Sequence, residues 1–192
     1  AVSSGMARHR NKGNQMNAEH KDERPVKIES DGTMLEGMLG VPDSANGIVL
    51  FAHGSGSSRH SPRNNFVARE LRQAGIGTLL FDLLTEDEDV VDLRTRELRF
   101  DIDLLARRLS GATRWLRQQD TAAGRKLGYF GASTGAAAAL KAGVDHADSV
   151  AAIVSRGGRP DLAGDALPKV EIPVLLIVGG NDVPVIGMNK DA

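Results

Sequence analysis

The stretch that decides the fold is LGYFGASTGAAAAL, residues 127–140, where a short apolar run meets a glycine-rich turn and then an alanine-rich segment. Residues 127–130 have the length and apolar character of a buried strand, and residues 135–142 those of a small-residue helix. Similar apolar runs recur at 47–52, 77–82, 150–154 and 174–178. Strands that are apolar throughout and alternate with amphipathic helices predict a parallel sheet covered on both faces. We therefore predict an α/β fold with one open, doubly wound, mostly parallel sheet.

The regions on either side add the remaining elements. Residues 26–29 and 34–41 alternate in polarity around the turn signal Asp31-Gly32, which predicts a hairpin. Helices are expected at 64–74 and at about 98–119, the latter with an exposed arginine-bearing face, and Phe66 and Trp115 are expected in the core. The acidic run 86–92 is interpreted as a solvated loop whose carboxylate spacing fits no familiar calcium or magnesium loop.

Composition limits the classes of function. The 192 residues carry 24 Lys and Arg against 25 Asp and Glu, a formal net charge of −1, which argues against nucleic acid or an anionic membrane as partner. The chain has no cysteine, which excludes disulfides and a thiol nucleophile. No apolar run is long enough to span a bilayer, and a cytoplasmic location is the default expectation. Residues 1–24 are predicted to be a disordered tail and residues 25–192 one domain.

The segment Gly131-Ala132-Ser133-Thr134-Gly135 matches the pattern G-x-S-x-G. It stands between a predicted strand and a predicted helix, which is where a nucleophilic serine is held in a strained turn with its hydroxyl exposed. The flanking glycines are needed because a side chain there would strike the neighbouring strand or helix. Glycine-rich strand-to-helix turns also bind phosphates in other α/β folds, but the context favours Ser133 as the nucleophile.

A second glycine-rich loop, HGSGSS at 53–58, ends another predicted strand at the same edge of the sheet. Backbone amides of such a loop, with the amide after the nucleophile, stabilise the oxyanion of an acyl-transfer reaction. We therefore expect the amides of Ser55 and Thr134 to form an oxyanion hole, and His53 to fix the loop by hydrogen bonds. The alternative is a loop that only turns the chain.

The last apolar strand is followed by GGNDVP, residues 179–184, which contains Asp182. A carboxylate at this position orients the catalytic histidine of a Ser-Asp-His triad, and the order serine then aspartate agrees with that role. Asp182 is the first candidate and Asp161, in the loop after the preceding strand, the reserve. A plain turn is the alternative, because these residue types favour turns.

Taken together, HGSGSS at 53–58, LLFDLL at 79–84, GYFGASTGAAAAL at 128–140 and VLLIVGGNDVPV at 174–185 resemble the α/β-hydrolase superfamily, in particular its small dienelactone-hydrolase-like branch. The resemblance covers about residues 26–192. It implies a serine hydrolase acting on carboxylic esters or lactones, with Ser133 as nucleophile and Asp182 as the acid. Dienelactone hydrolases proper use cysteine, so dienelactone itself is not the expected substrate.

The catalytic histidine of that family follows the acid by some tens of residues, after one further strand. All five histidines of this chain, His9, His20, His53, His60 and His146, precede Asp182. We therefore expect the last strand, the C-terminal helix and the histidine to lie beyond Ala192, so that the domain is incomplete at its C-terminus. His60 lies in the loop near the expected oxyanion hole and His146 follows the helix after Ser133, and the interpretation favoured for both is a surface histidine.

Arg156 and Arg159 lie on a glycine loop at the expected functional edge. Two arginines there would suit an anionic group of the substrate, although they would equally pair with neighbouring acids. No metal or other cofactor is implied, and the expected partner is a small-molecule ester, with the oligomeric state undetermined.

Two other classes remain open at this stage. A chain without its histidine would be a catalytically silent fragment or a binding remnant of the same fold. A nucleotide-binding domain would need G-x-G-x-x-G after the first strand, and the loop at 53–59 lacks the third glycine.

Overall fold

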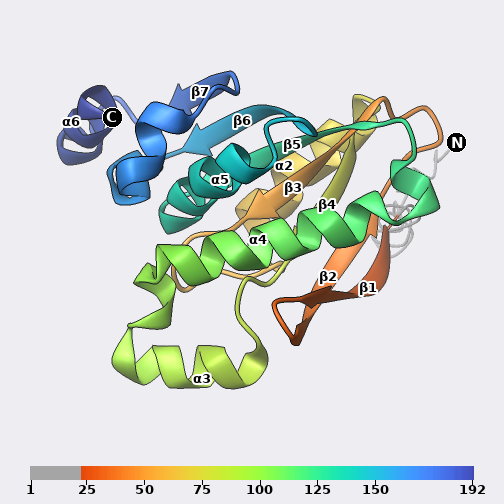
Figure 1. The fold of residues 1–192 in the computed structure, drawn as a ribbon, viewed down its shortest axis with the longest axis horizontal. Coiled ribbons are helices and arrows are strands. Elements are labelled where there is room, and N and C mark those ends of the chain that lie inside the picture. The colour runs from red at the N-terminus through yellow and green to blue at the C-terminus, as the bar shows by residue number, and fades with distance from the viewer. Residues whose placement is uncertain (1–22) are drawn as a thin grey trace, which may run out of the picture.

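The structure, a computed structural model, describes residues 23–192, and its centre is a seven-stranded sheet of order β1-β2-β4-β3-β5-β6-β7 (Figure 1). The strands are β1 Glu23–Ser30, β2 Thr33–Gly40, β3 Gly47–Ala52, β4 Gly77–Phe81, β5 Lys126–Ala132, β6 Val150–Arg156 and β7 Val174–Ile177. The β1–β2 and β2–β4 pairs are antiparallel, and the remaining four pairs are parallel. This confirms the predicted α/β class and the predicted hairpin.

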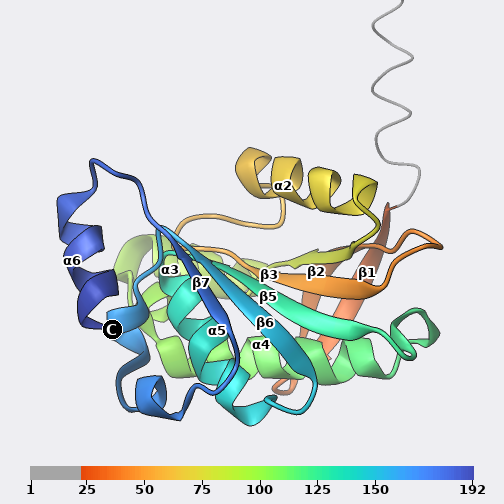
Figure 2. The same cartoon turned by 90° about the horizontal axis from the view of Figure 1, so that it is seen from above.

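Helices cover both faces of the sheet, with α2 on one face and α4 and α5 on the other (Figure 2). The helices are α2 Pro62–Gln73, α3 Glu86–Thr95, α4 Ile102–Arg117, α5 Thr134–Asp145 and α6 Val183–Asp191, with 3₁₀ segments η1 Leu98–Phe100, η2 Asp120–Ala122 and η3 Pro160–Lys169. No helix of residues 23–192 has both the length and the apolar character needed to cross a membrane.

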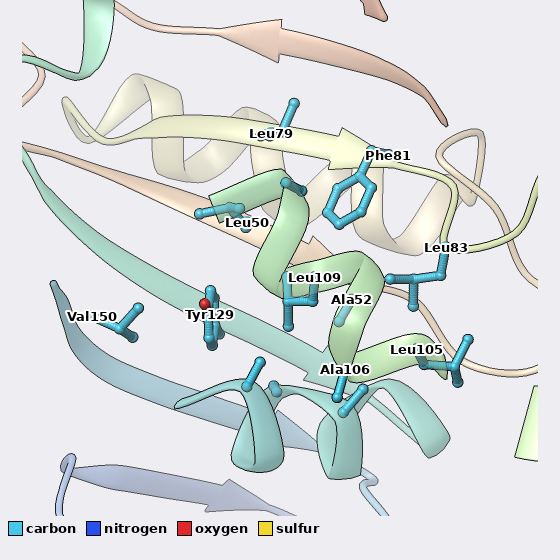
Figure 3. Close-up of a cluster of buried hydrophobic side chains, with 14 of the residues drawn as sticks. Leu50, Ala52, Leu79, Phe81, Leu83, Leu105, Ala106, Leu109, Tyr129 and Val150 are labelled. Carbon is cyan, nitrogen blue, oxygen red and sulfur yellow. The ribbon is translucent and has the colours of Figure 1, made fainter. Parts of the chain in front are cut away.

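The larger core lies between the sheet and the α4–α5 layer (Figure 3). Leu79 and Leu109 are completely buried there, and each such leucine contributes about 1.5–3 kcal/mol through the hydrophobic effect. Tyr129 is also buried, and its hydroxyl shares a 2.7 Å hydrogen bond with the Thr113 hydroxyl, so its polar end is satisfied. A smaller cluster beneath α2 consists of Phe51, Ala68, Leu80 and Phe130.

The centre of the sheet creates the place for a site. Strands β3 and β5 are parallel neighbours, with Ala52 opposite Gly131 near their carboxyl ends. The chain leaves β3 toward α2 on one face and leaves β5 toward α5 on the other (Figure 2). Connections that diverge in this way leave a crevice at the carboxyl edge, and ligands of open α/β sheets bind there.

The prediction of a loop at 86–92 was wrong, because these residues open helix α3. The Thr85 side chain accepts a hydrogen bond from the Glu88 amide, and the Glu88 carboxylate accepts one from the Thr85 amide, which is a capping box. The acids that suggested a solvated loop occupy the first turn, where the helix dipole favours negative charge.

The single helix expected at 98–119 is divided into η1 and α4, and Asp101 caps α4 by accepting a 2.9 Å hydrogen bond from the Leu104 amide. Its arginines are not all exposed. Arg108 is 5% exposed, donates to the Ser30 carbonyl at 2.9 Å and pairs with Glu88 at 2.7 Å. Because those contacts come from β1 and α3, helical periodicity alone did not reveal them.

Phe66 was expected in the core but is 56% exposed, since α2 turns Ala68 toward the sheet instead. Trp115 is partly buried and packs against the core. The sequence analysis also missed η3, which is kinked at Gly164 and contains Pro168, and α6, which has no clear apolar face.

The predicted tail, residues 1–24, lies largely outside the described residues. Its last two residues, Glu23 and Arg24, already belong to β1 and pair with Gly40 and Leu39 of β2. The described domain therefore begins at least two residues before the predicted boundary at residue 25.

Candidate active site

Ser133 occupies the turn between β5 and α5 with φ 50° and ψ −122°. A positive φ costs a residue with a side chain about 1–3 kcal/mol, so the surrounding packing must impose this conformation. Ser133 is only partly buried, while its neighbours Ala132 and Thr134 are buried. The turn thus leaves Ser133, the residue at its apex, accessible to solvent.

The flanking glycines explain how the turn is held. A Cβ on Gly131 would lie 2.5 Å from the Cα of Ala136 in α5. A Cβ on Gly135 would lie 2.5 Å from the His53 carbonyl oxygen and closer still to that of Ala52. Backbone occupies both positions and cannot move aside, which agrees with the steric reason given for the glycines of this motif.

The loop after β3 packs directly on this turn. A Cβ on Gly54 would lie 2.9 Å from the Cβ of Ser133, and the hydroxyls of Ser55 and Thr134 are 3.2 Å apart. Thr134 is the first residue of α5, and the leading amides of a helix have no acceptor within the helix. The two residues predicted to form an oxyanion hole are therefore brought together, although their catalytic role stays a prediction.

His53 holds the loop in place, as the sequence suggested. Its Nδ1 donates to the Gly54 carbonyl at 3.0 Å, and its Nε2 accepts a 3.0 Å hydrogen bond from the Leu83 amide after β4. Burial lowers the pKa of His53, while Gly54 and the charges of Asp82 and Asp89 oppose that effect. A neutral ring with both nitrogens engaged serves as a fixed connection between two loops.

The candidate acids differ in their surroundings. Asp182 follows β7 at the carboxyl edge of the sheet, is exposed, and makes no side-chain capping bond at the start of α6. The reserve candidate, Asp161, receives Arg159 in a two-pronged contact of 2.9 and 2.7 Å. Hydrogen bonding from Arg159 lowers the pKa of Asp161. Asp182 thus remains available to a partner, whereas Asp161 already has one.

The two arginines predicted to bind substrate are also separated by their contacts. Arg159 pairs with Asp161, which was the alternative interpretation, and its backbone amide donates to the Ser133 carbonyl at 3.1 Å. Arg156 has no acidic partner within residues 23–192 and donates to Asn64 Oδ1 at 3.3 Å. The two side chains therefore do not act as one clamp in this structure.

The described histidines do not supply a base for Ser133. His53 is engaged as described, His60 is exposed at the cleft that Arg59 and Asp82 also line, and His146 ends α5 at the amino edge of the sheet. Burial and the charge of Arg114 lower the pKa of His146. His9 and His20 lie outside the described residues.

Sequence reasoning missed a buried ion pair beside the loop. Asp92, which is 1% exposed, accepts from the Arg99 backbone amide at 3.0 Å and from Arg99 Nε at 2.5 Å. Burial alone would raise the pKa of Asp92, but hydrogen bonds and charge from Arg99 keep it below its usual value. Arg99, Ser55 and Thr134 line the same small cavity. The partners lie in separate elements, α3 and η1, so the sequence pattern of neither one indicated the pair.

Two larger hollows open near the ends of strands β3 and β6. A cleft of about 510 Å³ lies between the loop after β3 and the start of α3, and includes Arg59, which pairs with Asp82 and Glu36. A shallower pocket of about 330 Å³ lies between the start of α2 and the end of β6. Within residues 23–192 no group of three or more His, Cys, Asp or Glu side chains is arranged to hold a metal ion.

A mostly parallel sheet with a strained serine between a central strand and its helix is the arrangement of the α/β hydrolases. Among solved structures, a dienelactone hydrolase from Anabaena variabilis is 60% identical with a TM-score of 0.85, and the match covers 88% of this chain and 78% of that one. The chain therefore belongs to the dienelactone-hydrolase-like branch of the α/β-hydrolase superfamily. No family model matches the sequence.

More distant structures share the fold. A dienelactone-hydrolase-like promiscuous phosphotriesterase from metagenomic libraries is 21% identical with a TM-score of 0.70, over 88% of this chain and 74% of that one. Est1E from Butyrivibrio proteoclasticus is 14% identical with a TM-score of 0.69, over 86% of this chain and 84% of that one.

Curated relatives from two strains of Mycobacterium tuberculosis are 54% identical over 167 residues, or 87% of this chain. They are provisionally named phosphoribosyl transferases. This chain spans 37% of their length, so their name describes proteins much longer than the matched region.

Proposed function

We propose that the protein is a serine hydrolase that cleaves a carboxylic ester or lactone, with Ser133 as its nucleophile. The observation that carries this proposal is the backbone of Ser133, whose positive φ is enforced by glycines packed on β3 and α5. Strain of this kind persists where the surrounding structure over-determines it, and it is concentrated at functional sites. Kinship with a dienelactone hydrolase supports the same reaction class.

In the proposed reaction, Ser133 Oγ attacks the ester carbonyl carbon and its proton passes to a histidine. The negative charge on the former carbonyl oxygen is held by the amides of Thr134 and Ser55, whose side chains are 3.2 Å apart. The histidine then protonates the departing alcohol oxygen, which leaves an acyl-serine ester. Attack by water on that ester releases the acid and restores the serine hydroxyl.

The histidine is the part that the described residues do not supply. In the proposed triad Asp182 orients this histidine, because its carboxylate is exposed at the same edge as Ser133. His53 is unsuited to the role because both of its ring nitrogens hold backbone groups.

The names of the relatives bear differently on the substrate. A dienelactone hydrolase cleaves a lactone, which is a cyclic carboxylic ester. The promiscuous phosphotriesterase has a similar fold, but its name refers to esters of phosphoric acid. The relatives named phosphoribosyl transferases are much longer, and this chain spans only 37% of their length. Their name is therefore the weakest guide to the substrate. Carboxylic esters are therefore the substrates to test first.

The test compares the full-length protein with its Ser133→Ala variant on 4-nitrophenyl esters. We expect kcat/KM to fall by about 10³-fold or more, because only the oxyanion amides and substrate binding would remain. Ser149→Ala is the matched control: it removes a serine hydroxyl at the opposite edge, where Ser149 donates to the His146 carbonyl, and should retain activity.

The competing hypothesis is a catalytically silent remnant of the hydrolase fold. It predicts that the full-length protein hydrolyses no ester faster than the Ser133→Ala variant does. Equal rates for the two proteins across a panel of acyl lengths would overturn the proposed function.

A further inference from the structure

Helix α6, which begins directly after Asp182, is attached to the domain through a polar residue. The helix lies at one end of the molecule, beyond the helices that cover the two faces of the sheet (Figure 1 and Figure 2). Of its nine residues only Asn189 is buried, with 8% of its surface exposed. A side-chain amide, and not an apolar cluster, is therefore what is buried where this helix meets the domain.

Asn189 binds the loop that follows β6. Its Nδ2 donates to the Gly158 carbonyl at 3.0 Å and to the Val185 carbonyl, one turn earlier in α6, at 2.8 Å. Its Oδ1 is buried and has no hydrogen-bond partner within residues 23–192. A buried acceptor without a donor costs free energy, and an apolar side chain would avoid that cost. What the asparagine adds is the directed hydrogen bond from α6 to Gly158.

The loop of residues 157–159 also contacts the end of β7 and the Ser133 turn. The Gly157 amide donates to the Ile177 carbonyl, in the last residue of β7, at 2.7 Å. The Arg159 amide donates to the Ser133 carbonyl at 3.1 Å. Consecutive residues of one loop are thus bonded to β7, to α6 and to the turn that carries the proposed nucleophile.

Gly158, at the centre of this loop, is held by close packing. A Cβ on Gly158 would lie 2.5 Å from the Cβ of Ala136 in α5, and closer still to the Ser155 hydroxyl of β6. Both neighbours are completely buried, so the loop has little room to move at this point. The carbonyl that Asn189 binds is therefore a fixed point of attachment for α6.

Asp182 is fixed to the other end of the same helix. Its carbonyl accepts the first hydrogen bond of α6, from the Ile186 amide at 2.9 Å. A helix rises 1.5 Å per residue, so Asn189 lies about 10 Å along the axis from Asp182. Because a helix of this length moves as one body, attachment at Asn189 sets where its first residues stand. The exposed carboxylate of Asp182 is thereby held without packing around it.

We propose that Asn189 is a positioning residue of the triad, which fixes Asp182 relative to Ser133 through the 157–159 loop. The Ser133 turn is held by its own packing, so loss of the Asn189 hydrogen bond displaces α6 and the acid. A displacement of about 1 Å in a catalytic arrangement lowers the rate by about 100-fold. This inference rests on the proposed hydrolase function, in which Asp182 orients the histidine.

The kinetic test compares the full-length protein with two variants on 4-nitrophenyl acetate: Asn189→Leu, which keeps the branched shape, and Asn189→Ala. We expect kcat to fall by about 10-fold or more in both, with KM changed less than about 2-fold, because a displaced acid slows the chemical step and leaves ester binding alone. Tyr129→Phe is the matched control. It removes a buried 2.7 Å hydrogen bond with Thr113 from the core and should retain kcat.

A double-mutant cycle identifies the residue through which Asn189 acts. In the Asp182→Ala background, Asn189→Leu should lower kcat no further, because the carboxylate that it positions is already gone. A residue that only stabilises the fold would lower kcat by the same factor in both backgrounds. Equal factors, or an unchanged kcat in the single variants, would overturn the proposal and leave the hydrolase function intact.

Hydrogen exchange tests the attachment of α6 without any turnover. In Asn189→Leu we expect the amides of α6 to exchange up to about 10-fold faster, the range of one hydrogen bond, while those of α4 keep their rates. Unchanged exchange in α6 would overturn the proposal. Faster exchange in α6, combined with no Ser133-dependent hydrolysis by the full-length protein, would support the attachment but overturn the proposed function and with it the role in a triad.

Discussion

The two ends of the carboxyl edge differ in how firmly the chain holds its candidate residues. At the β3–β5 end, backbone packs around Ser133 so closely that a Cβ on Gly135 would lie 2.5 Å from the His53 carbonyl oxygen. At the β7–α6 end, Asp182 is exposed, and a Cβ on Gly180 would meet nothing within 4 Å. The Ser133 end is therefore held rigidly by packing, whereas the Asp182 end is open.

Strand β7 makes the difference larger. All four of its residues are large and apolar, yet Leu175 is 56% exposed and Ile177 46%, whereas Leu79 of the interior strand β4 is fully buried. An edge strand of this kind invites pairing with further backbone. The contrast teaches that the conformation of Ser133 depends on the buried centre of the sheet, whereas Asp182 follows a strand that residues 23–192 leave largely uncovered.

The largest expected effect comes from adding one methyl group at each end of the edge and comparing the free energies of unfolding. Gly135→Ala should lower the free energy of unfolding by about 3 kcal/mol or more, because the methyl would overlap the Ala52 and His53 carbonyls. Gly187→Ala in α6 has open space around it and should raise stability by up to about 1 kcal/mol through helix propensity. Urea unfolding monitored by circular dichroism measures both changes. Similar stability for the two variants would remove the basis of the comparison.

A smaller effect tests the loop that packs on Ser133 through its pH dependence. The pKa of His53 is lowered in the folded state, so its stabilising contribution is complete above the unfolded pKa of about 6.5 and is lost as pH falls below it. We expect the free energy of unfolding to fall by about 1 kcal/mol between pH 7.5 and 5.5 for this reason. In His53→Gln the amide oxygen can still accept from the Leu83 amide without titrating, so the loss due to His53 should disappear. The smaller contribution of His146, whose pKa is also lowered, should remain in both proteins.

The matched control is His60→Gln, at an exposed histidine of the neighbouring cleft. It should retain the pH dependence of the parent protein. If the pH dependence of the free energy of unfolding disappeared in His60→Gln and persisted in His53→Gln, the prediction for His53 would be wrong.

Much of the central sheet could be predicted from sequence, because its strands are apolar throughout and glycine-containing turns mark where they end. Ser133, with the loop at 53–58, was placed correctly at one edge for the same reason: a strand, a turn and a helix each leave a local signal. The burial of Arg108 and the pairing of Asp92 with Arg99 left no such signal, since those contacts join separate elements or an irregular turn.

The isolation of Arg156 was hidden in a similar way. Sequence suggested that Arg156 and Arg159 act together, but Arg159 has Asp161 two residues away, whereas Arg156 faces α2 through Asn64. Only the packing of α2 on the sheet brings Arg63 to the same pocket as Arg156. Local sequence therefore identified the loop, and tertiary structure decided which of its arginines pairs with an acid.

The most direct test of the central claim is labelling of the full-length protein with an alkyl fluorophosphonate, followed by peptide mass spectrometry. A serine activated by a base and an oxyanion hole reacts rapidly with this reagent, whereas an ordinary serine does not. We predict one adduct, on Ser133, formed in step with the loss of esterase activity. Ester hydrolysis that persists while Ser133 remains unmodified would contradict the assignment of Ser133 as the nucleophile.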